Sequence, residues 1–143
     1  MNTFPEISKT ILSRTQNLEE VREFVSKAAR QFGFPGEDIE NIILAVDEAC
    51  TNIIKHAYKN APDKEIEIHI IRNKKTFEIK IFDKGATFDP TTLRVPDLKE
   101  HLSQHRRGGL GVFLMKKLMD NVEYKFMPGR PNEVRLKKYL QSR

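Results

Sequence analysis

The sequence predicts an α/β fold, a two-layer sandwich in which helices cover one face of a mixed, mostly antiparallel sheet. Three observations indicate it. Apolar residues recur every three or four positions along 39–57, which is the pattern of a helix with one buried face. Apolar and polar residues alternate along 65–71 and 76–82, as in a half-buried antiparallel hairpin. The segments follow one another as strand, two helices, two strands, helix and two strands, an order that suits one layered domain.

The first half of the chain holds one strand and two helices. Residues 7–12 are predicted to form a short strand. Asn17 is expected to start a helix, because its side chain can accept a first-turn N–H while Glu20 completes a capping box. Gly33 ends that helix, at a position that favours a left-handed backbone. The second helix begins within 35–38 and runs to about Tyr58.

The second half continues from the hairpin, whose turn is at 73–75. Between Gly85 and Gly108 the chain is polar and contains two prolines, so we expect a long loop with at most a short helical turn near 97–102. Long loops in compact domains are usually functional or mobile. A helix over about 110–119 and strands over 121–126 and 133–139, joined by the turn 128–131, complete the prediction.

Composition excludes several classes of protein. With 143 residues, 38% hydrophobic and 31% charged, the chain suits a single domain over 1–143. No apolar run approaches the roughly 20 residues of a membrane span, and the first residues do not resemble an export signal. We therefore expect no membrane segment and a cytoplasmic location. The net charge of +5 suits an anionic ligand or an acidic partner, but the basic residues lack the aromatic interleaving of a nucleic-acid surface.

Polar residues form one row on the long predicted helix. Glu48, Asn52 and His56 are four residues apart, which places them on a common face away from the apolar stripe. Asparagine is unfavourable inside a helix unless its side chain has a role, and its carbonyl oxygen suits Mg²⁺. Glu48 could accept a proton from an attacking hydroxyl. The alternative for Glu48 is a solvated face, and packing is the favoured interpretation for His56. Cys50, the only cysteine, falls on the apolar stripe and is predicted to be a small buried hydrophobe.

A second candidate lies at the end of the strand 76–82. The Asp83 carboxylate can accept hydrogen bonds from an amino group such as that of adenine, and Gly85 lacks the side chain that would block a flat ring. The alternative is an Asx-type turn at a strand end, which the same residues match equally well. Phe88 is expected to anchor the chain where it turns into the long loop.

A glycine cluster before a helix is the strongest segment. It consists of Arg106, Arg107, Gly108, Gly109, Leu110 and Gly111. Clustered glycines let backbone N–H groups close on phosphates, and the start of the following helix adds positive charge. No Lys-Ser or Lys-Thr pair follows, so this is not a Walker A loop, and no parallel strand precedes it as in a dinucleotide-binding fold.

Three segments carry a resemblance to a known family. VDEACTNIIKHAY (46–58), FDKGATFDP (82–90) and GGLGVFL (108–114) closely resemble the N, G1 and G2 boxes of the anti-sigma-factor serine-protein kinases. That family belongs to the GHKL-type ATPase superfamily shared by gyrase, Hsp90, histidine kinases and MutL. The likeness continues through 118–124 and spans almost the whole chain from the first helix on. It implies the Bergerat ATP-binding fold, with ATP under a lid formed by residues from about 91 to 107.

The resemblance also implies individual roles. These are the general base for Glu48, the Mg²⁺ ligand for Asn52, the adenine-binding carboxylate for Asp83, and nucleotide contacts for Gly85, Gly108, Gly109 and Gly111. Thr87 stands where the wider superfamily often has a second G1 glycine, which favours the anti-sigma branch. The final strand offers no obvious hydroxyl for adenine at Glu133 and Val134.

The function that the resemblance implies is that of an ATP-dependent serine/threonine protein kinase and anti-sigma regulatory factor. It would phosphorylate an anti-sigma-factor antagonist and sequester a sigma factor, with ATP and Mg²⁺ as cofactors. The resemblance further implies a homodimer. The alternative is an ATP-gated protein-binding switch with little or no kinase activity. A third hypothesis, nucleic-acid binding through the basic segment 135–143, is disfavoured.

Overall fold

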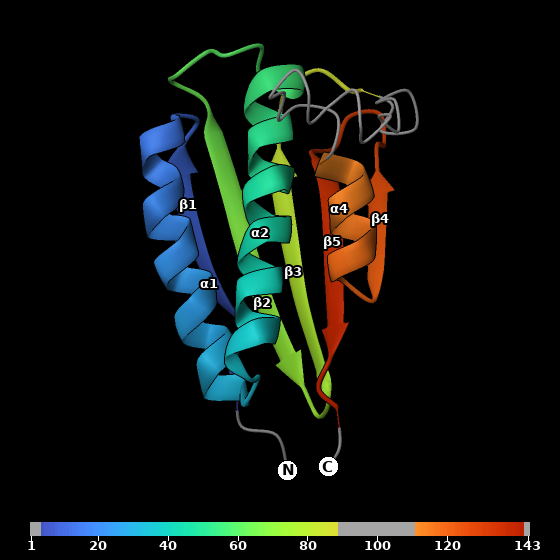
Figure 1. Cartoon of the computed structure of the whole chain (residues 1–143). Coiled ribbons are helices and arrows are strands. Elements are labelled where there is room, and N and C mark those ends of the chain that lie inside the picture. The colour runs from blue at the N-terminus through green and yellow to red at the C-terminus, as the bar shows by residue number, and fades with distance from the viewer. Residues whose placement is uncertain (1–3, 89–110, 142–143) are drawn as a thin grey trace, which may run out of the picture.

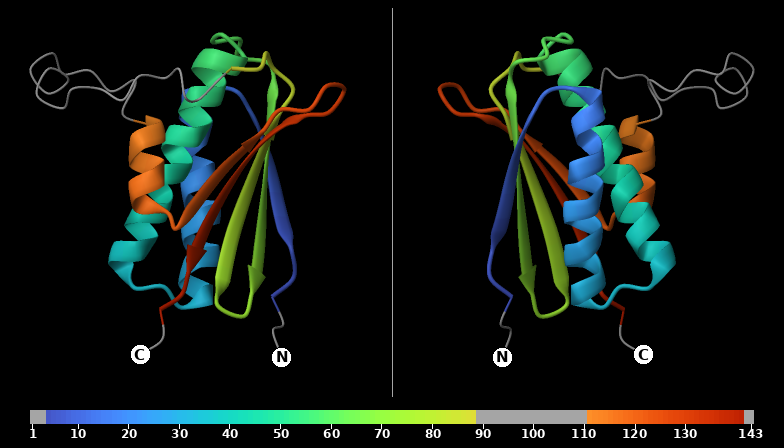
Figure 2. Two further views of the ribbon diagram at one scale, coloured as in Figure 1. Left: turned by 90° about the vertical axis from the view of Figure 1, so that its right-hand side faces the viewer. Right: turned by 90° about the vertical axis from the view of Figure 1, so that its left-hand side faces the viewer.

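The protein is a two-layer α/β sandwich, as the sequence predicts. The computed structural model describes residues 4–88 and 111–141. Helices lie on one face of a sheet, and none of the described residues forms a second layer on its other face (Figures 1 and 2). The strands are β1 Ile7–Leu12, β2 Glu65–Asn73, β3 Thr76–Asp83, β4 Asn121–Lys125 and β5 Asn132–Tyr139, and the helices are α1 Leu18–Phe32, α2 Gly36–Asn52 and α4 Gly111–Leu118.

The sheet has the strand order β1-β2-β3-β5-β4, and each of these neighbouring pairs is antiparallel. No parallel pair occurs within the described part of the chain, so the sheet there is not mixed. The predicted hairpin is confirmed: Ile68 pairs with Ile81, and Ile70 with Ile79. All four side chains are fully buried against the helices. Burial of one such side chain contributes about 1.5–3 kcal/mol, so this alternation fixes which face of the sheet carries the core.

The first helix is present, but the predicted capping box is wrong. A 3-10 turn, Thr15–Asn17, leads into α1, and Asn17 already has helical backbone angles of φ −77° and ψ −10°. A side-chain cap requires an extended residue, whereas here Asn17 Nδ2 donates to the Leu12 carbonyl. The predicted end of the helix is confirmed at Gly33, whose φ of 107° is left-handed and whose N–H donates to Ala29 and Arg30.

The second helix has two parts. α2 ends at Asn52, and the chain continues as a π-helical turn over Ile53–Ala57. Its wider hydrogen bonds include Tyr58 N–H to the Ile53 carbonyl at 2.9 Å. Turns of this kind are frequent at functional sites. The predicted polar row of Glu48, Asn52 and His56 is not uniformly exposed, because Asn52 is buried whereas His56 is exposed.

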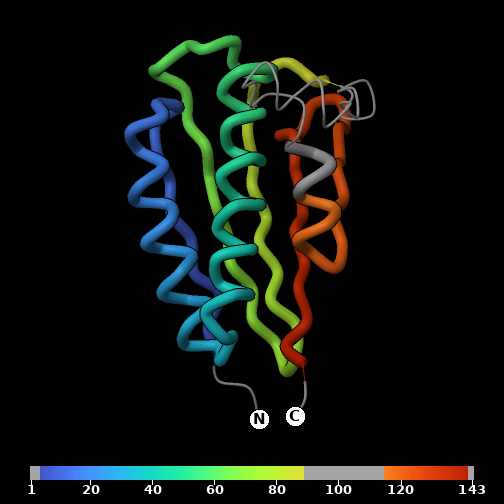
Figure 3. Tube along the Cα trace, in the orientation of Figure 1, coloured from blue at the N-terminus to red at the C-terminus, as the bar shows by residue number. Residues whose placement is uncertain are grey.

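The remaining elements bring the candidate residues to one end of the sheet. α4 packs on α2, with Met115 and Met119 buried. The end of α2, the start of β2 and the end of β3 meet at the end of the molecule remote from the chain termini (Figure 3). The predicted lid at 91–107, the helical turn at 97–102 and the cluster 106–110 lie outside the described residues.

Across residues 4–88 and 111–141, none of the helices combines the length and the apolar character that crossing a membrane requires.

Candidate functional site

Asp83, the last residue of β3, carries a buried carboxylate. Only 4% of the residue is exposed, because the strand alternation turns its side chain toward the helix layer. Its Oδ1 accepts hydrogen bonds from the Gly85 N–H and from Asn132 Nδ2, both at 2.9 Å. Oδ2 accepts none from any described residue. Burial raises the pKa of this carboxyl, and the bonds from Asn132 and Gly85 oppose the rise. One oxygen is therefore held by the protein, while the other can accept a hydrogen bond from a ligand.

The bond from the Gly85 N–H is the Asx-type turn that the sequence also predicted. The turn and a ligand-accepting role do not exclude each other, because the turn uses Oδ1 alone.

Asn132 is a site residue that sequence reasoning missed. It opens β5 opposite Asp83 in the strand register and is 4% exposed. Its Nδ2 donates to Asp83 Oδ1 and, at 3.0 Å, to the Gly85 carbonyl. The final strand carries no hydroxyl at Glu133 or Val134, whereas the polar partner of Asp83 is the amide of Asn132, one residue earlier. The register of β3 against β5 would have identified it.

Gly85 is required by close packing of two backbone segments. A Cβ at this position would lie 2.5 Å from the Ala57 carbonyl oxygen and 2.6 Å from its carbon. The next residue fixes the same contact, because the Ala86 N–H donates to the Ala57 carbonyl at 2.8 Å. The structure thus gives Gly85 a packing role against the end of the π-helical turn, beside the nucleotide contact that the sequence predicts.

Gly85→Ala is expected to destabilise the protein by about 1–3 kcal/mol, the range for overpacking, because backbone atoms rather than a flexible side chain must move. The measurement is the urea midpoint of unfolding. Gly36→Ala is the matched control, since no atom lies within 4 Å of its added Cβ and the position is at the start of a helix. Equal midpoints for Gly85→Ala and wild type would contradict the packing argument.

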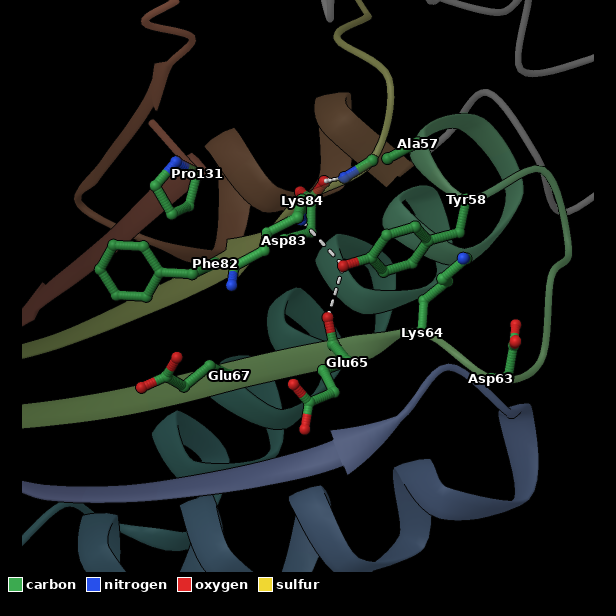
Figure 4. A pocket seen from close by; sticks show the side chains of 11 residues that line it. Ala57, Tyr58, Asp63, Lys64, Glu65, Glu67, Phe82, Asp83, Lys84 and Pro131 are labelled. Carbon is green, nitrogen blue, oxygen red and sulfur yellow. Dashed lines mark hydrogen bonds between the residues drawn. The ribbon is translucent and has the colours of Figure 1, made fainter. Parts of the chain in front are cut away.

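Tyr58 joins the end of the π-helical turn to the sheet. Continuing the β2–β3 register beyond Glu67 and Phe82 would pair Glu65 with Lys84. In place of a direct bond between these strands, the Tyr58 hydroxyl donates to the Glu65 carbonyl at 2.5 Å and accepts from the Lys84 N–H at 2.8 Å (Figure 4). The helix that carries Asn52 and the strand that carries Asp83 are therefore fixed relative to one another.

A pocket of about 570 Å³ opens beside this tyrosine (Figure 4). Glu65, Glu67 and Phe82, which line it, occupy the alternate positions of β2 and β3 that point away from the helices. From these positions the pocket reaches Asp83, which ends β3, and Gly85, which also line it.

Asn52 and Tyr124 are buried polar neighbours. Asn52 is 5% exposed, and neither its Nδ2 nor the Tyr124 hydroxyl has a hydrogen-bond partner of normal geometry among the described residues. Burial raises the pKa of the Tyr124 hydroxyl, and the Asn52 side chain, which lies within hydrogen-bonding reach of it, opposes the rise. Buried polar groups are nearly always paired, so an orphaned amide at this point is suited to a ligand. Glu48 lies one turn earlier on α2 and is half-buried.

Aromatic rings pack beside this pair. Phe88 lies 5.7 Å from His56, 6.1 Å from Tyr124 and 5.7 Å from Phe126, measured between ring centroids. Phe88 is half-buried, which supports its predicted role as an anchor, and the ring contact of His56 supports the packing interpretation.

The remaining predicted residues are those of the glycine cluster and Cys50. Gly111 begins α4, while Arg106, Arg107, Gly108, Gly109 and Leu110 lie outside the described residues. Cys50 is fully buried, and this burial, with a smaller contribution from the charge of Asp47, raises its pKa to about 12. A thiol in that state is unreactive, as the buried-hydrophobe prediction requires.

Comparison with known proteins gives a consistent result. Residues 11–138 match the family described as histidine kinase-like ATPase domain. The serine-protein kinase RsbW of Halalkalibacterium halodurans is 35% identical over 123 residues, which cover 83% of this chain and 75% of that protein. Its namesake in Bacillus cereus AH820 is 32% identical over 145 residues, covering 99% and 89%. The one in Listeria monocytogenes EGD-e is 37% identical over 109 residues, covering 73% and 69%.

Proposed function

The chain belongs to the histidine kinase-like ATPase domain family, and from this premise we propose that it is an ATP-dependent serine/threonine protein kinase that is also an anti-sigma regulatory factor. The name of these relatives, serine-protein kinase, supports the phosphotransfer activity. The observation on this chain that carries the proposal is the buried Asp83 carboxylate, with one oxygen held by Asn132 and the other able to accept a hydrogen bond from a nucleobase.

In the proposed complex, Asp83 Oδ2 accepts a hydrogen bond from the adenine amino group. Asn132 contributes indirectly, because its two bonds to Asp83 and to the Gly85 carbonyl set the orientation of the carboxylate. Tyr58 and Gly85 keep this end of β3 against the helix that supplies the residues for the phosphates.

The phosphate end is proposed to lie at Asn52 and Glu48. The Asn52 amide fits a Mg²⁺ site, since it is buried at the end of α2 and its oxygen is a hard ligand of the kind that Mg²⁺ prefers. Bound Mg²⁺ would offset the charge of the phosphate oxygens. The substrate hydroxyl attacks the γ-phosphorus, its proton passes to the Glu48 carboxylate, and the bond to ADP breaks. Arg106, Arg107, Gly108, Gly109, Leu110 and Gly111 are proposed to contact the phosphates, beneath a lid at 91–107.

The proposed protein substrate is an anti-sigma-factor antagonist, phosphorylated on a serine or threonine, and the second partner is a sigma factor that the kinase sequesters. Both partners and a homodimeric state are proposed from the family resemblance, while a single domain over 1–143 and a cytoplasmic location are proposed from length and composition.

The test is phosphoryl transfer in a purified system. Partners captured by the tagged chain are identified, and the antagonist is then incubated with the chain and Mg·ATP, with phosphosites mapped by mass spectrometry. Phosphorylation of one serine or threonine of the antagonist is expected. Tight ATP binding without single-turnover phosphorylation would instead favour the ATP-gated switch, and absence of ATP binding would refute both.

A further inference from the structure

A second cavity lies at the end of the sheet opposite to Asp83. It opens between α1 and the first residues of β1, has a volume of about 530 Å³ and includes Arg72 in its lining. β2 and β3 are antiparallel, so Arg72, near the end of β2, and Asp83, at the end of β3, are at opposite ends of the sheet. The end of β2 lies where the two chain termini lie (Figure 1). The cavity is therefore separate from the proposed nucleotide site.

The cavity exists because β2 continues past the start of β1. The last pair between these strands is Ile7 with Ile70, whereas β2 extends to Asn73. Arg72 follows Ile70 on the face of β2 that points toward the helices, and only 5% of the residue is exposed. A row of buried isoleucines on β2 thus ends in a buried cation at the edge of the cavity.

Arg72 is held in place by neutral groups of α1 and of the N-terminal segment. Its Nη1 donates to the Ala28 carbonyl at 3.4 Å and to Gln31 Oε1 at 3.0 Å. Its guanidinium carbon lies 4.5 Å from the centre of the Phe4 ring, a favourable contact of a cation with an aromatic face. Phe4 packs in turn on Phe32, with 5.7 Å between ring centroids. These contacts fix the guanidinium and add no negative charge.

The charge of the cavity is positive. Its described lining contains two ionisable side chains, Arg72 and Lys27, and both are basic. Burial lowers the pKa of Arg72, which means that its surroundings disfavour the positive charge. An anion in the cavity would offset this effect. A carboxylate is the best match, because its two oxygens fit the planar fork of a guanidinium.

One face of α1 supplies both an apolar wall and the second cation. Phe24, Lys27, Ala28 and Gln31 are spaced three or four residues apart, so they lie on a common face of the helix, and all four line the cavity. Phe4 adds a second aromatic ring to the lining. Small-molecule sites commonly combine apolar walls with a few placed polar groups, and this cavity has a volume in their usual range.

We propose that this cavity binds a small organic acid, whose carboxylate pairs with the Arg72 guanidinium and whose apolar body lies against Phe4 and Phe24. Lys27, which is exposed, adds positive charge around the carboxylate. The proposed kinase activity does not require this site, so the domain has a second ligand site at the end remote from the nucleotide. If Arg72 served only to hold α1, the cavity would have no preference for acids.

The experiment is titration of the ¹⁵N-labelled full chain with benzoate, followed through the backbone amide signals in NMR spectra. Saturable shifts are expected within 24–31 and 70–73, and none around Asp83. Benzamide has the shape of benzoate without its charge, and acetate has the charge without the ring. Each is expected to bind at least about tenfold more weakly than benzoate, because each lacks one of the two interactions.

Substitutions separate binding from folding. Arg72→Met should weaken benzoate binding by about 10–100-fold, the range for a hydrogen bond to a charged group. It should also lower the Tm, since the bonds to α1 are lost. Lys27→Met therefore gives a second test: the Tm should stay unchanged, and benzoate affinity should fall by about two- to fivefold. Arg30→Met, which removes an exposed charge of α1 outside the cavity, should leave benzoate affinity unchanged.

Several results would overturn the inference. They are the absence of saturable shifts in 24–31 and 70–73, affinity for benzamide or acetate equal to that for benzoate, and wild-type affinity in both Arg72→Met and Lys27→Met. The α-amide of N-acetylglutamate represents an acidic side chain of a protein partner. If it binds more tightly than benzoate, the cavity receives a protein side chain and the assignment to a small acid is wrong.

Discussion

Glu48→Gln is expected to slow phosphorylation of the antagonist by about 10²–10⁴-fold while ATP still binds, because that is the usual contribution of a positioned general base. Glutamine has nearly the shape of glutamate but cannot take the proton of the attacking hydroxyl. Glu48 is half-buried, one turn before Asn52, so its side chain and the proposed metal ligand share a helix face.

Single-turnover transfer at saturating Mg·ATP measures this effect, with calorimetry as the check on nucleotide binding. Glu40→Gln is the matched control, because Glu40 lies on the same helix but is exposed, two turns away. Transfer at the wild-type rate in Glu48→Gln would exclude Glu48 as the base, and loss of ATP binding would indicate a structural role instead.

Asp83→Asn should lower ATP affinity by about 10–100-fold, the range for a hydrogen bond to a charged group. The structure also predicts the direction of a change in specificity. The Gly85 N–H and Asn132 Nδ2 both require an acceptor at the Oδ1 position, so the substituted amide must turn its nitrogen toward the ligand. That nitrogen is a donor: it opposes the adenine amino group but complements the O6 acceptor of guanine.

Competition between ATP and GTP measures this outcome. The ratio of ATP to GTP affinity should fall in Asp83→Asn, whereas Asp63→Asn, an exposed carboxyl in the loop before β2, should leave it unchanged. An unaltered ratio together with unaltered ATP affinity would remove Asp83 from the nucleobase site.

The same carboxyl predicts a pH dependence. Burial raises the pKa of Asp83 above the ordinary value of 3.8, so ATP affinity should begin to fall on acidification at a higher pH than for an ordinary aspartate. The folding stability changes with pH in the opposite direction to the ATP affinity. The folded state binds this proton more tightly than the unfolded chain, so stability relative to Asp83→Asn should decrease as pH rises from 3.8 through the raised pKa and then stay level. Urea unfolding of both proteins across this range provides the measurement.

The elements of the fold could be predicted because their signals are local. Residues 65–71 and 76–82 alternate, and residues 39–57 are periodic, because each segment buries one of its faces. Each pattern is therefore visible within a single stretch of the sequence. The same holds for Gly33, since a left-handed helix end is a property of one residue. The predicted capping box failed because an upstream 3-10 turn, a feature of the preceding connection, had already placed Asn17 in helical geometry.

The sequence by itself determined the two-layer fold, the order of its elements and the candidates Glu48, Asn52 and Asp83, because periodicity and short motifs depend on neighbouring residues. Only the tertiary structure decided how these candidates are supported: Asn132 holds Asp83, Tyr58 bridges β2 and β3, and Gly85 packs against Ala57. Each of these contacts joins residues that are 7 to 49 positions apart. The contacts depend on the register of the strands and on the direction that the chain takes after the π-helical turn. Such contacts leave no periodic signal in the chain, because packing of the whole core selects them.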